Sequence, residues 1–349
     1  MPTSTVDRHR PGRRLLPVCA GLLSAVAGFF ALTALGAGGA AGTARAPAAA
    51  PARALTPLQA YSQQAATREG LGNIAGARPV QELVPVAPAE FDRPIAESRA
   101  YAQARLRAMA KDVDRLIGAL AAGSRSRSEQ LWLTAYGTYL RLGGVYGEFG
   151  QLDTAIDGTP GGLARGTANP DFTGLHRIEF GLWTGRAPDG LLPAAVALAG
   201  NIRRLEKVVP TVAITPLAYA TRAHEILEDA QRDFLSGADV PWSGEGVFAT
   251  AAAVAATEEV LTTLRPLLDG RGSTIEQVDF GLTRLRAVLA EIRHAHGGGW
   301  PTLGQLSQLA SERLDGALGF VLEELAGIPG ELETQMPPTI PALPAPAGR

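Results

Sequence analysis

The amino-acid sequence predicts an all-α protein built as two packed up-and-down four-helix bundles. From Ile95 onward, apolar residues recur every three or four positions, which is the spacing of a buried helix face. Alternating and β-branched runs, which are typical of strands, are almost absent from the same region. The expected helices are about 20 residues long and are joined by short links, and seven or eight such helices fill two bundles.

The N-terminal segment, residues 1–46, is predicted to be a signal peptide or a signal anchor. An uncharged run between Leu15 and Thr43 follows four basic residues, which are Arg8, Arg10, Arg13 and Arg14. If the segment is not cleaved, residues 15–43 are long enough to tether the chain to a membrane. In both cases we expect an exported protein, periplasmic or extracellular, that is associated with the cell surface.

The cysteine content and the net charge exclude several functions for the exported part of the chain, the residues after 46. The single cysteine, Cys19, lies inside the N-terminal segment, so the body has no thiol for disulfides, nucleophilic catalysis or thiolate metal sites. Any metal ion must therefore be held by oxygen and nitrogen. The formal net charge is −2, and residues 1–46 carry five arginines and one aspartate, which leaves the rest near −6. An acidic body argues against a nucleic-acid partner.

The remaining chain divides into three parts. Residues 47–94 read as an Ala/Pro-rich tether and irregular N-terminal arm, residues 95–326 as the helical domain, and residues 327–349 as a Pro-rich C-terminal tail. The expected helices cover residues 95–122, 127–147, 172–183, 190–208, 215–236, 246–268, 275–295 and 303–326. The segment from Gly150 to Asp171 is rich in glycine and proline, and we expect a loop there. Loops of this length in a compact bundle are often functional.

A histidine and a glutamate stand three residues apart just after this loop. His176 and Glu179 lie on one face of the helix expected at 172–183. Imidazole nitrogen and carboxylate oxygen suit a transition metal, and Glu and His at this spacing hold metals in helical bundles. A hydrogen-bonded pair on a helix face is the alternative that spacing alone leaves open.

Other histidines offer weaker candidates. His224 and Glu228 are four residues apart and share a helix face, either as ligands or as part of a polar surface. Glu228 stands where a zinc protease helix would carry its second histidine, which argues against that class. His294 and His296 come at the end of an expected helix, where cationic side chains are favoured.

The residues around His176 resemble a known family. The segment from Phe172 to Trp183 is similar to the Gly-x-His-x-x-Glu signature of imelysin-like proteins, and in particular of the EfeO-type iron-uptake proteins. The flanking segments 149–157 and 223–229 also resemble that family, and the likeness covers residues 95–325. It implies paired four-helix bundles with a metal site between helices. It also implies delivery of iron to a membrane permease, alongside a haem-type peroxidase. The chain lacks the length and β pattern for the cupredoxin domain of some relatives.

The chain departs from the family pattern at two expected ligand positions. Relatives often carry a glutamate where residues 141–144 read Arg-Leu-Gly-Gly, and a Tyr-Ser-His-x-Asp-like stretch where residues 242–246 read Trp-Ser-Gly-Glu-Gly. Other carboxylates lie close enough in sequence to compensate. The candidate ligands are therefore His176, Glu179, Glu148, Asp157, Glu245, His224 and Glu228.

The sequence thus predicts an extracytoplasmic, non-enzymatic metal-binding protein of an EfeO-like iron-uptake system. Iron, as Fe²⁺ or Fe³⁺, is the favoured ion, and Zn²⁺ or Mn²⁺ suits the same oxygen and nitrogen ligands. Two alternatives stay open. One is an imelysin-type metallopeptidase, and the other is a scaffold protein with a degenerate metal site, suggested by the glycines at 143, 244 and 246.

Overall fold

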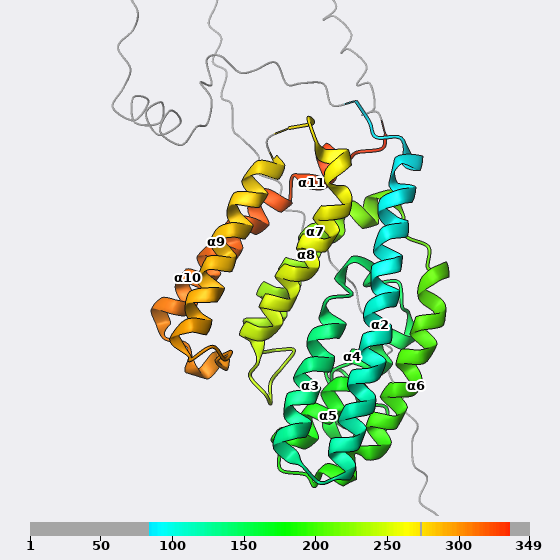
Figure 1. The fold of residues 1–349 in the computed structure, drawn as a ribbon, viewed down its shortest axis with the longest axis vertical. Coiled ribbons are helices and arrows are strands. Elements are labelled where there is room, and N and C mark those ends of the chain that lie inside the picture. Colours follow the sequence, from blue (N-terminus) through cyan, green and yellow to red (C-terminus); the bar gives the residue numbers. More distant parts are fainter. Residues whose placement is uncertain (1–83, 273, 336–349) are drawn as a thin grey trace, which may run out of the picture. The chain divides into compact units, whose positions relative to one another are not determined.

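The computed structural model describes residues 84–272 and 274–335, whose longer helices pack as two bundles (Figure 1). Each bundle is a ring of four helices. In the first ring each helix contacts the next, in the order α2 (Asp92–Ala121), α3 (Arg125–Leu140), α5 (Gly174–Trp183) and α6 (Leu192–Val208). The second ring contains α7 (Pro216–Asp229), α8 (Gly246–Leu268), α9 (Thr274–Ala295) and α10 (Gln308–Leu325). The all-α prediction is confirmed, and these residues contain no strand.

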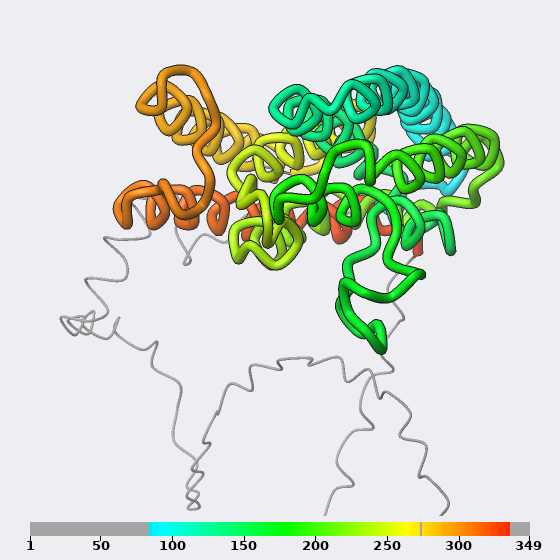
Figure 2. Tube along the Cα trace, turned by 90° about the horizontal axis from the view of Figure 1, so that it is seen from below, coloured from blue at the N-terminus to red at the C-terminus, as the bar shows by residue number. Residues whose placement is uncertain are grey.

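Smaller elements complete the two bundles. α4 (Gln151–Asp157) packs on α5 and α6, and α11 (Ile328–Glu331) packs on α7. A π-helical turn, Ala230–Phe234, continues α7 before the chain enters the link to α8. Figure 2 shows the segment between α4 and α5 projecting away from the helices. These short elements at the helix ends determine where the polar side chains described below meet.

The helices form where apolar spacing and capping residues coincide. α2 buries Leu106, Met109 and Val113 at helical spacing. Thr215 caps the start of α7, and its side chain accepts a hydrogen bond of 3.2 Å from the N–H of Ala218. α10 begins in the same way at Ser307.

α8 is the helix that both bundles share. It contacts α7 and α9 in its own ring and α2 and α3 in the other. Within the described residues it is also the helix that is long and apolar enough to cross a membrane, but 67% of its apolar window is buried inside the protein. Burial against protein on most sides accounts for this composition.

Several element boundaries differ from those expected. The helix expected at 127–147 ends at Leu140, because Gly143–Val145 forms a 3-10 turn packed against α7 and α8. The expected loop at 150–171 contains α4. The helix expected at 303–326 starts as a separate 3-10 turn, Leu303–Gln305, before α10 begins.

The packed body extends past residues 95–326 at both ends. Val86, Phe91 and Ile328 are fully buried, and the N–H of Val86 donates to the carbonyl of Glu333 at 2.9 Å. The predicted N-terminal segment 1–46 with Cys19, the tether up to residue 83 and the tail from residue 336 lie outside the described residues.

Candidate metal centre

Three side chains from separate elements converge beside α5. His176 stands in the first turn of α5, Asp157 is the last residue of α4, and Asp239 lies in the link between α7 and α8. His176 Nε2 lies 3.3 Å from Asp157 Oδ1 and 3.4 Å from Asp239 Oδ1. One ligand atom from each of the three residues lies within 4.8 Å of the others. We call these residues the triad.

The spacing within the triad suits a small transition-metal ion. With metal–ligand distances of about 2.1 Å, two ligands lie about 3.0 Å apart at a right angle and about 3.4 Å apart at the tetrahedral angle. The two distances from Nε2 fall within that range. Nε2 of His176 and Oδ1 of Asp157 are also buried without a hydrogen-bond partner among the described residues. Two polar atoms buried in this way are available to a cation.

Glu179 lies behind His176 rather than beside its Nε2. Its Oε2 is 2.9 Å from His176 Nδ1, on the opposite edge of the ring. Its Oε1 accepts hydrogen bonds from the N–H of Ser243 at 2.8 Å, the hydroxyl of Ser243 at 2.8 Å and the N–H of Trp242 at 3.3 Å. Both His176 and Glu179 are fully buried.

Tyrosines of α3 orient the acidic side chains nearby. The hydroxyl of Tyr136 donates to Oδ2 of Asp239, and that of Tyr139 donates to Oδ1 of Asp153 at 2.6 Å. Burial, together with nearby carboxylates, raises the pKa of both phenols well above 10. Both hydroxyls therefore keep their protons at neutral pH and act as donors.

The triad carries unusual protonation equilibria. Burial raises the pKa of Asp157 to about 7, although the neighbouring imidazole of His176 opposes the shift. Burial alone would lower the pKa of His176, but the nearby carboxylates of Asp157, Asp239 and Glu179 raise it well above 6.5. Burial would raise the pKa of Asp239, but the neighbouring imidazole of His176 outweighs this effect and lowers the pKa. The raised pKa favours a protonated imidazole, whose Nε2 faces Asp157 and Asp239.

Local sequence explains why α4 and α5 meet at this point. Gly174 has a φ of +78°, and a Cβ there would lie 2.2 Å from the carbonyl oxygen of Ile156. Only glycine permits this approach, which brings Asp157 to the start of α5. Trp132 of α3 donates its indole N–H to the carbonyl of Leu175 at 2.8 Å and so fixes the same turn.

Of the predicted ligands, the structure brings His176 and Asp157 together and sets Glu179 on the far side of the imidazole. The triad does not include Glu148, Glu245, His224 or Glu228. His224 and Glu228 form a partly exposed pair on α7, 3.6 Å apart. Glu245 precedes α8, where burial raises its pKa to about 7. Glu148 lies half-buried in the turn before α4.

Asp239 and Tyr136 were not expected from the sequence. Asp239 lies in a link and has no periodic relation to His176, while Tyr136 occupies a buried position of α3 like its apolar neighbours. The two glycines of the 3-10 turn have a packing explanation. A Cβ at Gly143 would lie 2.8 Å from Ile226 Cδ1, and one at Gly144 would lie 2.9 Å from Ser98 Oγ. The tight packing leaves no room for a glutamate at either position.

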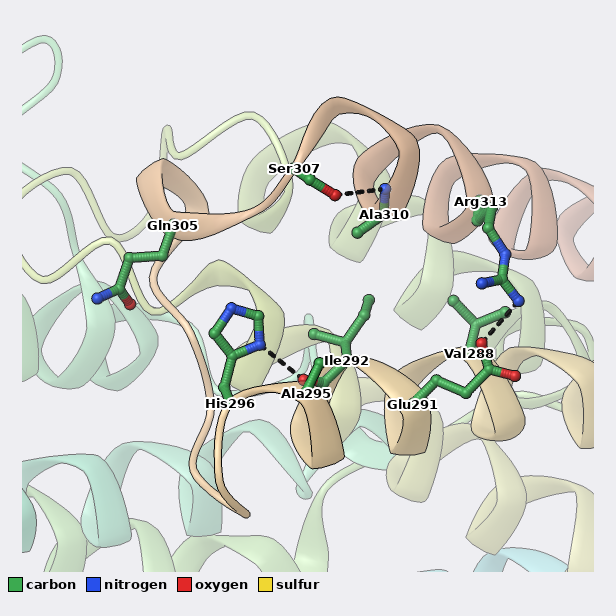
Figure 3. A pocket seen from close by; sticks show the side chains of 9 residues that line it. All are labelled: Val288, Glu291, Ile292, Ala295, His296, Gln305, Ser307, Ala310 and Arg313. Carbon is green, nitrogen blue, oxygen red and sulfur yellow. Dashed lines mark hydrogen bonds and ion pairs between the residues drawn. The ribbon is translucent and has the colours of Figure 1, made fainter.

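A separate cavity of about 380 Å³ lies between α9 and α10 (Figure 3). Its polar groups largely bond to one another: Arg313 pairs with Glu291 at 2.7 Å, and His296 Nδ1 donates to the carbonyl of Ile292 at 2.7 Å. None of the triad residues lines it. We therefore locate the candidate metal centre at the triad.

Comparison with known proteins agrees with this architecture. The chain is 24% identical over 235 residues to "Iron uptake system component EfeO" of Escherichia coli (strain K12), and equally to EfeO of Shigella flexneri, covering 67% of this chain and 62% of each relative. It is 21% identical over 255 residues to "Iron uptake system component EfeM" of Pseudomonas syringae pv. syringae (strain B728a), covering 73% of this chain and 89% of the relative. The chain thus spans about three fifths of the EfeO relatives' length.

The family model agrees with the signature around His176. Residues 94–315 match the model described as Imelysin, which also bears the label Peptidase M75. The match covers more than half of the chain and contains α2 from its third residue, α3 to α9, all three triad residues and Glu179. The chain belongs to the imelysin family.

Proposed function

We propose that this protein binds an iron ion outside the cytoplasm, as a non-enzymatic component of an iron-uptake system. The observation that carries the proposal is the triad, in which one imidazole nitrogen and two carboxylate oxygens converge, and two of these three atoms are buried without a hydrogen-bond partner among the described residues. The iron ion is cargo that the protein takes up and hands on. Two aspartates give the triad a charge that balances a divalent ion when His176 is neutral.

The relatives' names favour iron as the cargo. EfeO and EfeM are each named as an iron uptake system component. Oxygen and nitrogen ligands suit Fe²⁺ and Fe³⁺, and they also suit Zn²⁺ and Mn²⁺, so ligand type alone does not select iron. The side chains of Asp157 and Asp239 are 22% and 15% exposed, which leaves an approach for a cation from solvent.

The same proposal assigns a place and partners to the protein. The predicted signal in residues 1–46 directs the body to the periplasm or the cell surface, where residues 15–43 tether it if they are retained. A membrane iron permease would receive the ion, and a haem-type peroxidase would belong to the same system. Both partners rest on the resemblance to EfeO-type proteins.

Titration calorimetry of the purified full chain tests the proposal. We expect Fe²⁺, under anaerobic conditions, and Zn²⁺ to bind more tightly than millimolar. His176→Ala and Asp239→Asn each remove a triad ligand and are expected to weaken binding by more than about 100-fold, since even outer-shell changes cost 10–100-fold. His224→Ala and Glu245→Gln are matched controls outside the triad, and both are expected to bind like the parent.

The result that overturns the proposal is equally definite. If neither ion binds the parent more tightly than millimolar, or if His176→Ala binds as the parent does, the triad is not a cargo site. A scaffold role with a degenerate site would then be the better interpretation.

The family label Peptidase M75 keeps a metallopeptidase as the second candidate. Hydrolysis at a metal needs a base near the metal-bound water. The signature carboxylate, Glu179, is bonded to Nδ1 of His176 and to Ser243, away from Nε2. We therefore expect no cleavage of casein by the Zn²⁺-loaded protein. Zn²⁺-dependent cleavage that Glu179→Gln abolishes, while Zn²⁺ binding survives, would favour the peptidase instead.

A further inference from the structure

We propose that Glu179, the carboxylate of the family signature, is a positioning residue that fixes two ligands, His176 and Asp239, from outside the coordination sphere. The inference rests on the proposed function of the triad, because it concerns how the same site is held. In this role the glutamate of the Gly-x-His-x-x-Glu signature holds the metal ligands in place and does not itself bind the ion. Three features carry it: the imidazole ring, the link before α8 and the acceptor capacity of Glu179.

The imidazole ring presents its two nitrogens to different partners. Nδ1 and Nε2 point away from each other, so a carboxylate bonded to Nδ1 lies across the ring from an ion bound to Nε2. Glu179 Oε2 is 2.9 Å from Nδ1, while both triad aspartates face Nε2. A hydrogen bond from Nδ1–H to Glu179 fixes the tautomer whose lone pair is on Nε2. It also stops the ring from rotating.

The link that carries Asp239 is tied to the same carboxylate. Three and four residues after Asp239, the N–H groups of Trp242 and Ser243 donate to Glu179 Oε1, with the Ser243 hydroxyl as a third donor. The N–H of Gly244 donates to the carbonyl of Val240 at 2.9 Å and closes the turn between these points. Glu179 therefore attaches this turn to α5. On the other side of the link, Tyr136 holds Oδ2 of Asp239 and leaves Oδ1 facing His176.

Both carboxylate oxygens of Glu179 already accept hydrogen bonds from the protein, three at Oε1 and one at Oε2. An ionised carboxylate offers about four lone-pair positions. Glu179 accepts four hydrogen bonds, and its side chain is fully buried. Asp157, by contrast, has Oδ1 buried without a hydrogen-bond partner among the described residues. The structure thus places the free acceptor on the triad aspartate and the satisfied carboxylate behind the ring.

Cobalt(II) provides the test, because its visible spectrum reports the number and type of ligands while titration reports affinity. The full chain and its Glu179→Gln variant are compared. Glutamine keeps the shape of the side chain, but only its oxygen can accept hydrogen bonds. It therefore cannot accept from His176 and from Ser243 at the same time. We expect Co²⁺ affinity to fall by about 10–100-fold, the range for outer-shell partners of metal ligands. At saturating Co²⁺ the absorption bands should match those of the parent in position and intensity.

Two further variants serve as controls, one for a change of ligand and one for a partial loss of positioning. Asp157→Asn alters a ligand, so its Co²⁺ spectrum should change. Ser243→Ala removes one donor at the far end of Glu179 and cannot touch the ion. It should weaken Co²⁺ binding by a smaller factor than Glu179→Gln, again with the parent spectrum. Circular dichroism of each metal-free variant checks that it is folded, and if Glu179→Gln is not, the Ser243→Ala result decides.

The Co²⁺ measurements can overturn the positioning role of Glu179 without overturning metal binding by the triad. A changed Co²⁺ spectrum in Glu179→Gln makes Glu179 a ligand and overturns the positioning role, while the triad function stands. Unchanged affinity in both Glu179→Gln and Ser243→Ala also overturns it. If the parent binds no Co²⁺, no Zn²⁺ and no Fe²⁺, the proposed function fails and the positioning role fails with it.

Discussion

At the scale of single residues, the triad is a place where a proton and a metal ion compete. The raised pKa of His176 favours a protonated imidazole, whose Nε2 faces Asp157 and Asp239. Asp157, with a pKa of about 7, also takes up a proton near neutral pH. A metal ion needs the deprotonated form of each ligand, so binding releases protons. Affinity must therefore depend on pH.

The first prediction is that Zn²⁺ binding strengthens between about pH 5.5 and pH 8, by up to about tenfold per pH unit for each proton displaced. The stability of the metal-free protein should fall over the same rise in pH. Asp157 has a folded-state pKa above its ordinary value of 3.8, so its stabilising proton is fully present below that value and is lost as pH rises through about 7. The raised pKa of His176 contributes in the same direction.

Thermal unfolding measures both effects. The melting temperature with saturating Zn²⁺ minus that without Zn²⁺ should widen steadily as pH rises. His224→Ala, which leaves the triad intact, is expected to show the same widening as the parent. A difference that stays constant across this pH range would contradict competition between proton and metal.

A second prediction at this scale concerns the phenol that holds Asp239. Tyr136→Phe removes the hydroxyl that donates to Oδ2 of Asp239 and leaves the ring in place. We expect metal affinity to fall by about 10–100-fold, as for other outer-shell partners. Tyr139→Phe is the matched control, because it loses an equivalent phenol whose partner is Asp153, outside the triad. Each variant should lose about 1 kcal/mol of unfolding free energy, and calorimetry should detect weakened binding in Tyr136→Phe alone.

At the scale of elements, Gly174 determines how closely α4 approaches α5. A methyl group there would collide with the carbonyl oxygen of Ile156, and the φ of +78° is itself unfavourable for alanine. Gly174→Ala is therefore predicted to separate the two helices and move Asp157 away from His176. Gly185 offers a matched control, because its φ is +86° but a Cβ at that position would meet no atom within 4 Å.

The two glycine variants should differ in a simple way. Gly185→Ala is expected to cost about 1–2 kcal/mol for backbone strain and to bind metal like the parent. Gly174→Ala is expected to cost more and also to weaken metal binding. Denaturant unfolding and calorimetry measure the two quantities. Equal stability losses with equal affinities would show that the close approach of α4 and α5 does not hold the site.

The length and apolar periodicity of each helix decide whether the sequence predicts it. Long amphipathic helices such as α2 and α9 were predictable because their apolar spacing extends over many turns. α4 was missed because it has only seven residues and stands in a segment full of glycine and proline. The end of α3 was missed because Leu142 and Val145 continue its apolar spacing, whereas the close packing at Gly143 and Gly144 ends the helix.

The candidate site was predictable only in part, for a related reason. His176 and Glu179 share one helix, so their spacing revealed them. Asp157 was reached through the resemblance of its segment, and Asp239 was not reached at all. Its position depends on the π-helical turn and the link after it, and neither has a periodic signal. Even the role of Glu179 depends on Trp242 and Ser243, more than 60 residues away.

At the scale of the whole molecule, the triad lies where the two bundles meet. Asp157 and His176 belong to elements packed in the first bundle, and Asp239 belongs to the link between two helices of the second. An ion bound by all three would therefore connect the bundles. A bound ion stabilises the segments that its ligands connect. The stabilisation should therefore be measurable in both bundles and not only at the triad residues.

The last prediction follows from that connection. Amide hydrogen exchange should slow on Zn²⁺ binding in α5 and also at Trp242 and Ser243, because opening either side breaks the site. The outer pair α9 and α10 makes its main contacts within the second bundle, with each other and with α7 and α8, and should exchange at an unchanged rate. His176→Ala should abolish the protection without altering exchange in the metal-free state far from α5. Protection confined to one bundle would mean that the ion is held by fewer than three residues, and that Asp239 faces the site without closing it.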